Sequence, residues 1–219
     1  MKIIEPSFRL STPYQDGLLR SDGICLLRFI ELQARISHRS EEKRTKDSWE
    51  RFIPAVVGQH GDWSVTEHAS ITCTVRVSRG TTHELVRHRI SSYTQESTRF
   101  VRYKDLEFLY PANAPEGCFA NWDLCIEQAE RTYLDLLTAG WRPQEARSVL
   151  PNALAATLAI TNNLRSWRLF FLMRTTKETH PDVKQITLPM LEEFKRVVPI
   201  LYDDIVPGTR QVDNLRLPR

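Results

Sequence analysis

The chain has 219 residues, of which 41% are hydrophobic and 26% are charged, as in an ordinary globular protein. This length suffices for one substantial core, so we expect a single domain over residues 1–219. The formal net charge of +3 is mild, which favours small anionic ligands and argues against nucleic acid as a partner.

The sequence gives no sign of a metal site or of a membrane segment. The four cysteines are scattered without a CxxC pair, and the two His and two acids of residues 60–68 have no spacing that provides three ligands. We therefore expect reduced thiols and no metal. The N-terminus lacks an apolar signal segment and no run reaches membrane-spanning length, which predicts a cytoplasmic protein with no membrane partner.

The first part of the chain is predicted to contain an edge strand, two helices and a half-buried strand. Residues 2–10 are apolar and lean towards β structure. Apolar side chains recur at helical spacing in residues 24–36, and a second helix is expected after a cap at Asp47 or Ser48. Residues 70–78 alternate between apolar and polar side chains, which is typical of a strand with one buried face.

Residues 81–103 concentrate the groups that bind anions. Thr82 is expected to cap a short helix that carries the triplet RHR at residues 87–89. The two Arg side chains present planar forks of donors that fit phosphate or carboxylate. His88 lies between two like charges, so we expect it to be neutral and to hydrogen-bond or stack. A solvated basic surface helix is the alternative interpretation of such a triplet.

The rest of the chain is predicted to add a loop, two strands and four helices. These are a polar loop at residues 91–98, strands at 100–109 and 153–161, and helices at 122–138, from Pro143, at 167–173 and at 181–198, the last interrupted at Pro189. The eight glycines form neither GxGxxG nor a P-loop. Side-chain donors would therefore have to hold the phosphates of any bound dinucleotide.

The spacing R-H-R-x-x-S-x-x-x-x-S-x-R, from Arg87 to Arg99, resembles the signature of the flavin-dependent thymidylate synthases. Six fixed positions at fixed spacing make a chance match improbable, and further similar stretches run through residues 30–186. The resemblance implies an α+β fold with a mixed or antiparallel sheet flanked by long helices, in a single catalytic domain. It also implies FAD as cofactor, dUMP, methylenetetrahydrofolate and NADPH as substrates, dTMP as product, and a homotetramer with shared active sites.

The resemblance further assigns residues to the site. FAD would be held by Ser37, Ser64, Arg87, His88, Arg89, Ile90, Gln95, Asn163 and Arg165. The dUMP nucleotide would be bound by Glu84, Arg87, Gln95, Glu96, Ser97, Thr98, Arg99, Arg147 and Arg174. Arg174 is the candidate catalytic residue, because a guanidinium beside the uracil carbonyl and N3 favours the ionised ring and raises electron density at C5.

Some assignments have alternatives in the residues themselves. Ser37 is also an ordinary helix terminator, and Arg147 is also an ordinary exposed helical Arg. Relatives often carry His where this chain has Asp62, so Asp62 or His60 would take its place. The segment around His180 is about two residues longer than in the family, which leaves its equivalence to a flavin contact open.

Two other functional classes remain as alternatives. A nucleic-acid-binding module would use the basic helix with Tyr93 or Phe100 as stacking groups. A flavoprotein without synthase activity is suggested by Asp62. No cysteine lies in the basic loop near the motif, which argues against the thiol attack of the unrelated classical synthases.

Overall fold

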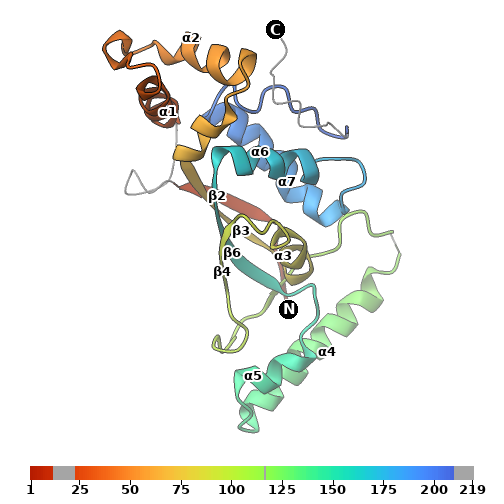
Figure 1. The fold of residues 1–219 in the computed structure, drawn as a ribbon. Coiled ribbons are helices and arrows are strands. Elements are labelled where there is room, and N and C mark those ends of the chain that lie inside the picture. The colour runs from red at the N-terminus through yellow and green to blue at the C-terminus, as the bar shows by residue number, and fades with distance from the viewer. Residues whose placement is uncertain (12–22, 116, 210–219) are drawn as a thin grey trace.

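The computed structural model describes residues 1–11, 23–115 and 117–209 and shows an α+β architecture (Figure 1). Its centre is a four-stranded sheet in which every pairing is antiparallel, in the order β2-β3-β6-β4. The strands are β2 (Ser7–Ser11), β3 (Ser70–Ser78), β4 (Ser92–Gln95) and β6 (Ala155–Asn163). Separately, β1 (Lys2–Ile3) pairs in parallel with β5 (Glu107–Phe108). The predicted α+β class with an antiparallel sheet is confirmed.

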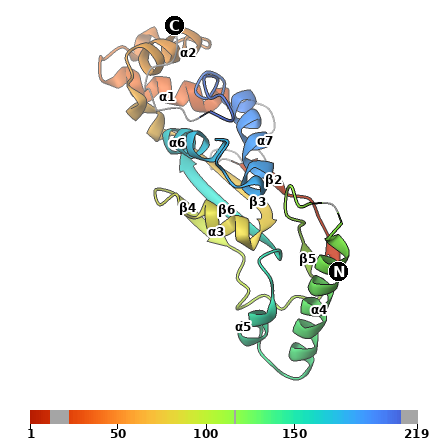
Figure 2. The same ribbon diagram turned by 90° about the vertical axis from the view of Figure 1, so that its right-hand side faces the viewer.

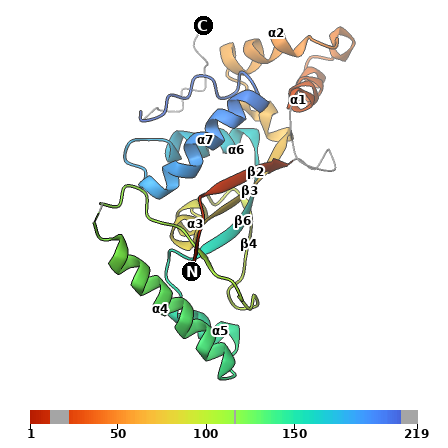
Figure 3. The ribbon, with the colours of Figure 1, turned by 180° about the vertical axis from the view of Figure 1, so that it is seen from behind.

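Helices cover the sheet and extend beyond it at both ends. They are α1 (Ile24–Ile36), α2 (Trp49–Ile53), α3 (Arg79–Leu85), α4 (Phe119–Thr138), α5 (Pro143–Ala146), α6 (Leu164–Arg174) and α7 (Pro181–Val197). Shorter turns are η1 (Glu41–Lys43), η2 (Pro54–Gln59), η3 (Trp63–His68) and η4 (Arg147–Val149). Figures 1 and 2 show α1 and α2 at one end of the molecule and α4 and α5 at the other. From behind, α7 lies alongside α6 (Figure 3).

The longest pairing in the sheet joins β3 to β6. Its register runs over nine residues of each strand, from Ser70 opposite Asn163 to Ser78 opposite Ala155. Because the strands are antiparallel, α3 leaves β3 at one end of the sheet while α6 leaves β6 at the other. Both helices then run back towards the middle, so that their carboxyl ends meet.

Two hydrophobic clusters support this arrangement. The larger one packs α1, α6 and α7 against the sheet, and it contains an aromatic group in which Phe171 lies 4.9 Å from Phe194 and 5.9 Å from Trp167 between ring centroids. The smaller cluster gathers around α4 and includes Phe108 and Tyr133, both fully buried. In the described ranges no helix combines the length and the apolar character needed to cross a membrane.

Several predicted elements are confirmed and others are corrected. The helix at residues 24–36 and the strand at 70–78 lie where their periodicity placed them. Thr82 is not the cap of α3: the helix begins at Arg79, and the Ser78 hydroxyl accepts a hydrogen bond from the backbone N–H of Thr81 at 3.1 Å. Since α3 ends at Leu85, the RHR triplet follows the helix instead of lying on it.

The predicted loop at 91–98 and strand at 100–109 are also largely wrong. Residues 92–95 form β4, a short polar strand at the sheet edge, because their backbone pairs with residues 158–161 of β6. Only Glu107–Phe108 of the second prediction is strand, and Phe100 is 78% exposed. The predicted interruption at Pro189 is absent: α7 continues through this proline, which lies on the exposed face of the helix.

A buried ion pair links α6 to the chain that follows α7. Arg168 is 2% exposed, and its two terminal nitrogens donate to the two carboxylate oxygens of Asp204 at 2.7 and 2.5 Å. The guanidinium also donates to the backbone carbonyl of Leu201 at 3.0 Å and lies 4.5 Å from the ring centroid of Trp63. Truncation of one partner leaves the other charge buried.

We expect Arg168→Ala to lower the free energy of unfolding by about 3–5 kcal/mol, because Asp204 would keep its charge without its guanidinium partner. Urea denaturation at one fixed protein concentration measures the loss. Arg196→Ala is the matched control, since Arg196 pairs with Glu193 on the exposed face of α7 and should change stability little. Equal losses in the two variants would contradict the structural importance of the buried pair.

Candidate active site

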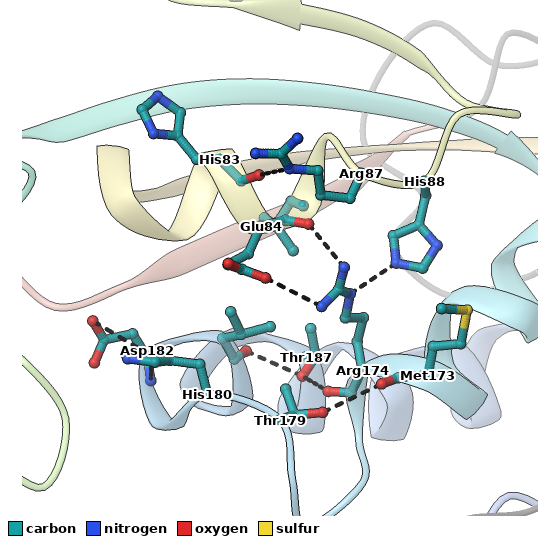
Figure 4. Close-up of polar contacts among 12 residues, drawn as sticks. His83, Glu84, Arg87, His88, Met173, Arg174, Thr179, His180, Asp182 and Thr187 are labelled. Atoms are coloured by element: carbon teal, nitrogen blue, oxygen red, sulfur yellow. Dashed lines mark hydrogen bonds and ion pairs between the residues drawn. The ribbon is translucent and has the colours of Figure 1, made fainter.

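The carboxyl ends of α3 and α6 meet at a polar cluster of Arg174, His88 and Glu84 (Figure 4). The Arg174 Nε donates to His88 Nε2 at 2.9 Å, and Nη2 donates to the backbone carbonyl of Glu84 at 3.1 Å. Nη1 makes a longer contact of 3.4 Å with the Glu84 carboxylate. Three residues that the sequence assigned to one site are therefore together in space.

The local backbone explains why Arg174 points into this cluster. Arg174 is the last residue of α6, and its carbonyl accepts a hydrogen bond from the Thr187 hydroxyl of α7 at 2.7 Å. The Glu84 carbonyl belongs to the last turn of α3, where carbonyl groups carry partial negative charge and attract a cation. The guanidinium is thus held at the meeting point of two helix ends.

His88 is neutral, as the sequence predicted, but for a different physical reason. Its ring packs against Phe170, with 4.8 Å between ring centroids, and the Tyr93 hydroxyl lies 2.8 Å from the His88 carbonyl. Burial first, and the charge of Arg174 second, lower the pKa of His88 to about 4. The flanking arginines of the RHR triplet are not among the causes of this shift.

A second group of predicted residues lies where β4 leads into the next turn. The Arg147 Nη1 donates to the Thr98 hydroxyl at 3.1 Å, so η4 and this turn are in contact. The Ser97 hydroxyl accepts from the backbone N–H of Arg99 at 3.3 Å. Hydroxyl and guanidinium donors therefore collect here, which is the chemistry of an anion site. Gln95, the last residue of β4, donates to the hydroxyl of Thr82 at 3.0 Å.

Glu96 belongs to a charge network that sequence reasoning missed. One carboxylate oxygen accepts from the Tyr103 hydroxyl at 2.6 Å, and the other accepts from Arg76 at 2.6 Å and from the backbone N–H of Thr157 at 3.2 Å. Burial favours a raised pKa for Glu96, but the bonds from Tyr103 and Arg76 outweigh it and the pKa is lowered. The charged Arg76 within the alternating pattern of residues 70–78 was the one sequence feature that indicated an acidic partner near this strand.

Three of the remaining predicted cofactor residues, Asn163, Arg165 and Ser64, lie towards the amino end of α6. The Asn163 side chain accepts from the backbone N–H of Ser166 at 2.8 Å and caps the helix, while Arg165 pairs with Glu67 of η3 at 2.6 Å. Ser64 is exposed on η3, which packs against α1 and α6. Ser37 follows α1, where its hydroxyl donates to the Ala34 carbonyl at 2.9 Å. Arg165 and Arg174 are nine positions apart on one helix, which places them roughly 13 Å apart along its axis.

Three of the residues with open alternatives, Asp62, His60 and His180, occupy exposed positions. Asp62 and His60 both lie in the segment that precedes η3. His180 is the N-cap of α7, and its Nδ1 accepts from the backbone N–H of Asp182 at 3.2 Å. Within the described ranges, no three side chains of His, Cys, Asp or Glu gather in a way that would hold a metal ion.

Comparison with solved structures defines the class of fold. The chain resembles the UMP/dUMP methylase PolB from Streptomyces cacaoi, whose crystal structure is bound with 5-Br dUMP, with a TM-score of 0.72. The match covers 92% of this chain and 95% of that chain at 22% sequence identity, a level that establishes the shared fold alone.

Sequence comparison identifies the family. The family model described as "Thymidylate synthase complementing protein" matches residues 27–200. A flavin-dependent thymidylate synthase from Mycobacteroides abscessus is 31% identical over 227 residues, covering 93% of this chain and 88% of the relative. The chain therefore belongs to the flavin-dependent thymidylate synthase family. A relative of the same name from Saccharolobus solfataricus is 36% identical over 166 residues, which are 74% of this chain but only 63% of that relative's length.

The low pKa of His88 makes stability depend on pH in a defined direction. Well above pH 6.5 both the folded and the unfolded chain hold a neutral imidazole. As the pH falls from 6.5 towards 4, the unfolded chain takes up a proton that the folded chain refuses, so stability decreases. Because solvent screens part of the ring, we expect this contribution to be about 1–2 kcal/mol.

Urea denaturation of the wild type and of His88→Gln at pH 7 and at pH 4.5 measures this contribution. Glutamine does not titrate, so the variant should lose less stability than the wild type over this interval. The carboxylates that also titrate there should lower the stability of both proteins equally. Equal losses would show that His88 is not held neutral by its surroundings.

Proposed function

We propose that this chain is a flavin-dependent thymidylate synthase that converts dUMP to dTMP. Methylenetetrahydrofolate provides the one-carbon unit and NADPH provides two electrons through FAD. The observation that carries the proposal is the Arg174 guanidinium, held by His88 and by the end of α3 within the site that the RHR motif marks. Membership of the family and a shared fold with a protein solved with 5-Br dUMP support it.

In this proposal Arg174 acts on the pyrimidine ring. A guanidinium carries five N–H donors, and the contacts in the site engage three of its nitrogens once each. Donors therefore remain for a carbonyl oxygen and N3 of uracil. Negative charge that develops on this edge of the ring is stabilised by the fixed cation, and electron density at C5 rises, where the carbon–carbon bond forms.

The phosphate of dUMP is assigned to the turn after β4. Arg147 already contacts this turn through Thr98, and Ser97 and Arg99 supply a hydroxyl and a second guanidinium. These are the donor types that bind a dianionic phosphate by charge-assisted hydrogen bonds. The carboxylate of Glu96 is engaged by Arg76 and Tyr103, so we assign Glu96 to the support of this turn.

The residues assigned to FAD have the chemistry that this cofactor needs. Arg87 and Arg89 are exposed guanidinium groups beside Ile90, which is 79% exposed, so cations for a diphosphate adjoin an apolar surface for a ring. Asn163 and Arg165 offer further polar groups at the amino end of α6. The bound flavin would supply the hydride chemistry, and the protein would bind, orient and exclude water.

We also propose a single catalytic domain that assembles as a homotetramer with shared active sites. Assigned flavin residues lie at both ends of α6, roughly 13 Å apart, so one chain presents two separate partial sites. Large apolar side chains, among them Phe100, Leu169 and Met173, are exposed on the isolated chain. A second copy would bury such surface. Analytical ultracentrifugation of the purified protein tests the assembly.

The experiment for the reaction is an anaerobic visible spectrum of the purified protein before and after NADPH, dUMP and methylenetetrahydrofolate, with dTMP assayed at the end. A flavin band that bleaches with NADPH and recovers as dTMP appears supports the synthase. Bleaching without dTMP identifies a flavoprotein lacking synthase activity. A protein that binds no flavin even after FAD is added contradicts the proposal.

Replacement of Arg174 tests the central assignment. We expect Arg174→Ala to lower kcat/KM for dUMP about 30- to 150-fold, the equivalent of one charge-assisted contact of about 2–3 kcal/mol. Arg174→Lys should recover only part of this, because an ammonium cannot present two parallel donors. Steady-state dTMP formation is the measurement. Arg131→Ala, on the exposed face of α4, is the matched control and should match the wild type.

A further inference from the structure

The three contacts of Arg174 differ in length and in the exposure of the acceptor, so two of them can fix the guanidinium while the third can be exchanged for a ligand. The bonds of Nε to His88 and of Nη2 to the Glu84 carbonyl are short and directed at groups fixed by the fold. The contact of Nη1 is long, at 3.4 Å, and its acceptor is the Glu84 carboxylate, whose side chain is 52% exposed. A ligand oxygen can replace an exposed carboxylate at Nη1 more readily than it can replace either of the other two acceptors.

His88 is itself held on three sides. Its ring packs on Phe170, which precedes Arg174 by one helical turn, so α6 presents to one imidazole both an aromatic surface and a donor. From β4, the Tyr93 hydroxyl lies within hydrogen-bond distance of the carbonyls of His88 and Leu85. The triplet is thereby fixed to the end of α3, and Nε2 faces the guanidinium.

The chemistry of this contact requires a neutral ring. A guanidinium has donors only, so the partner of Nε must offer a lone pair, which an imidazolium lacks. Arg174 from α6 is the charged group in contact with His88, and Glu84 from α3 contacts the same guanidinium on its far side from the ring; Tyr93 and Phe170, from β4 and α6, are uncharged. Only the neutral tautomer with its proton on Nδ1 satisfies this arrangement.

We infer that His88 is a positioning residue for the reaction: its Nε2 holds Nε of Arg174 so that Nη1 meets the pyrimidine carbonyl of dUMP. This inference rests on the proposed function and adds to it a task for His88 that direct contact with FAD would not require. Loss of the acceptor, Nε2 of His88, leaves the charge of Arg174 in place, but the orientation of the guanidinium is no longer fixed. Misplacement of a reacting contact by about 1 Å is enough to cost about 100-fold in rate.

The test is a series of variants of the FAD-loaded enzyme. Glutamine places an amide oxygen close to the position of Nε2, whereas asparagine is one methylene shorter and does not reach it. We expect His88→Gln to keep kcat within about fivefold of the wild type and His88→Asn to lower kcat about 10- to 100-fold. The KM for dUMP should change by no more than about threefold, because the phosphate contacts are untouched. His83→Gln, exposed on α3, is the matched control and should have wild-type kinetics.

A double-mutant cycle separates this role from direct binding of the cofactor. If His88 acts through Arg174, then adding His88→Asn to Arg174→Ala should cost less than about twofold. The flavin absorbance per protein should be the same in all variants, and calorimetric titration with dUMP should show nearly unchanged affinity for His88→Gln and His88→Asn. Both readouts are independent of turnover.

Three results would overturn the inference. These are equal activities of His88→Gln and His88→Asn, a full additional loss in the Arg174→Ala background, or loss of flavin from His88→Asn. A wild-type enzyme that forms no dTMP would instead overturn the proposed function, and the stated role of His88 with it. Activity of the wild type therefore distinguishes the two failures.

Discussion

The antiparallel pairing of β3 with β6 is the constraint on which the site depends. It sends α3 and α6 away from opposite ends of the sheet, and only a return of both helices across the same face brings their carboxyl ends together. The cation of Arg174 then meets carbonyl groups of α3, and burial of Phe170 and Trp167 in the aromatic core anchors the helix that carries it. The chemistry of the site is thus a consequence of sheet register.

The parts of the fold that followed from sequence are those with a local cause. Residues 24–36 and 70–78 carry clear helical and alternating patterns, and both elements have the predicted bounds. β4 could not be recognised, because its four residues carry no apolar alternation and exist as a strand only through the backbone of β6. Likewise, α3 begins earlier than predicted because Ser78 ends a strand and caps a helix at the same position.

The candidate site shows the same division between local and distant causes. The spacing of the RHR motif selected His88 through a family resemblance, and the further stretches that resemble the family selected Arg147 and Arg174. The contact between His88 and Arg174 joins residues 86 positions apart, so no pattern within either segment could reveal it. The network around Glu96 arises in the same way, from side chains of β3 and of the chain beyond β4 that the sheet brings together.

The presence of Arg165 and Arg174 on one continuous helix has a consequence for how the protein can vary. Each residue of an α-helix advances the side-chain direction by about 100° and the axis by about 1.5 Å. A substitution in the middle of α6 alters packing, but the insertion or deletion of a single residue would turn Arg174 away from His88 while Arg165 stayed in place. The length of α6 is therefore under stricter constraint than its composition, and evolutionary drift in this region should appear as exchange of residues without change in their number.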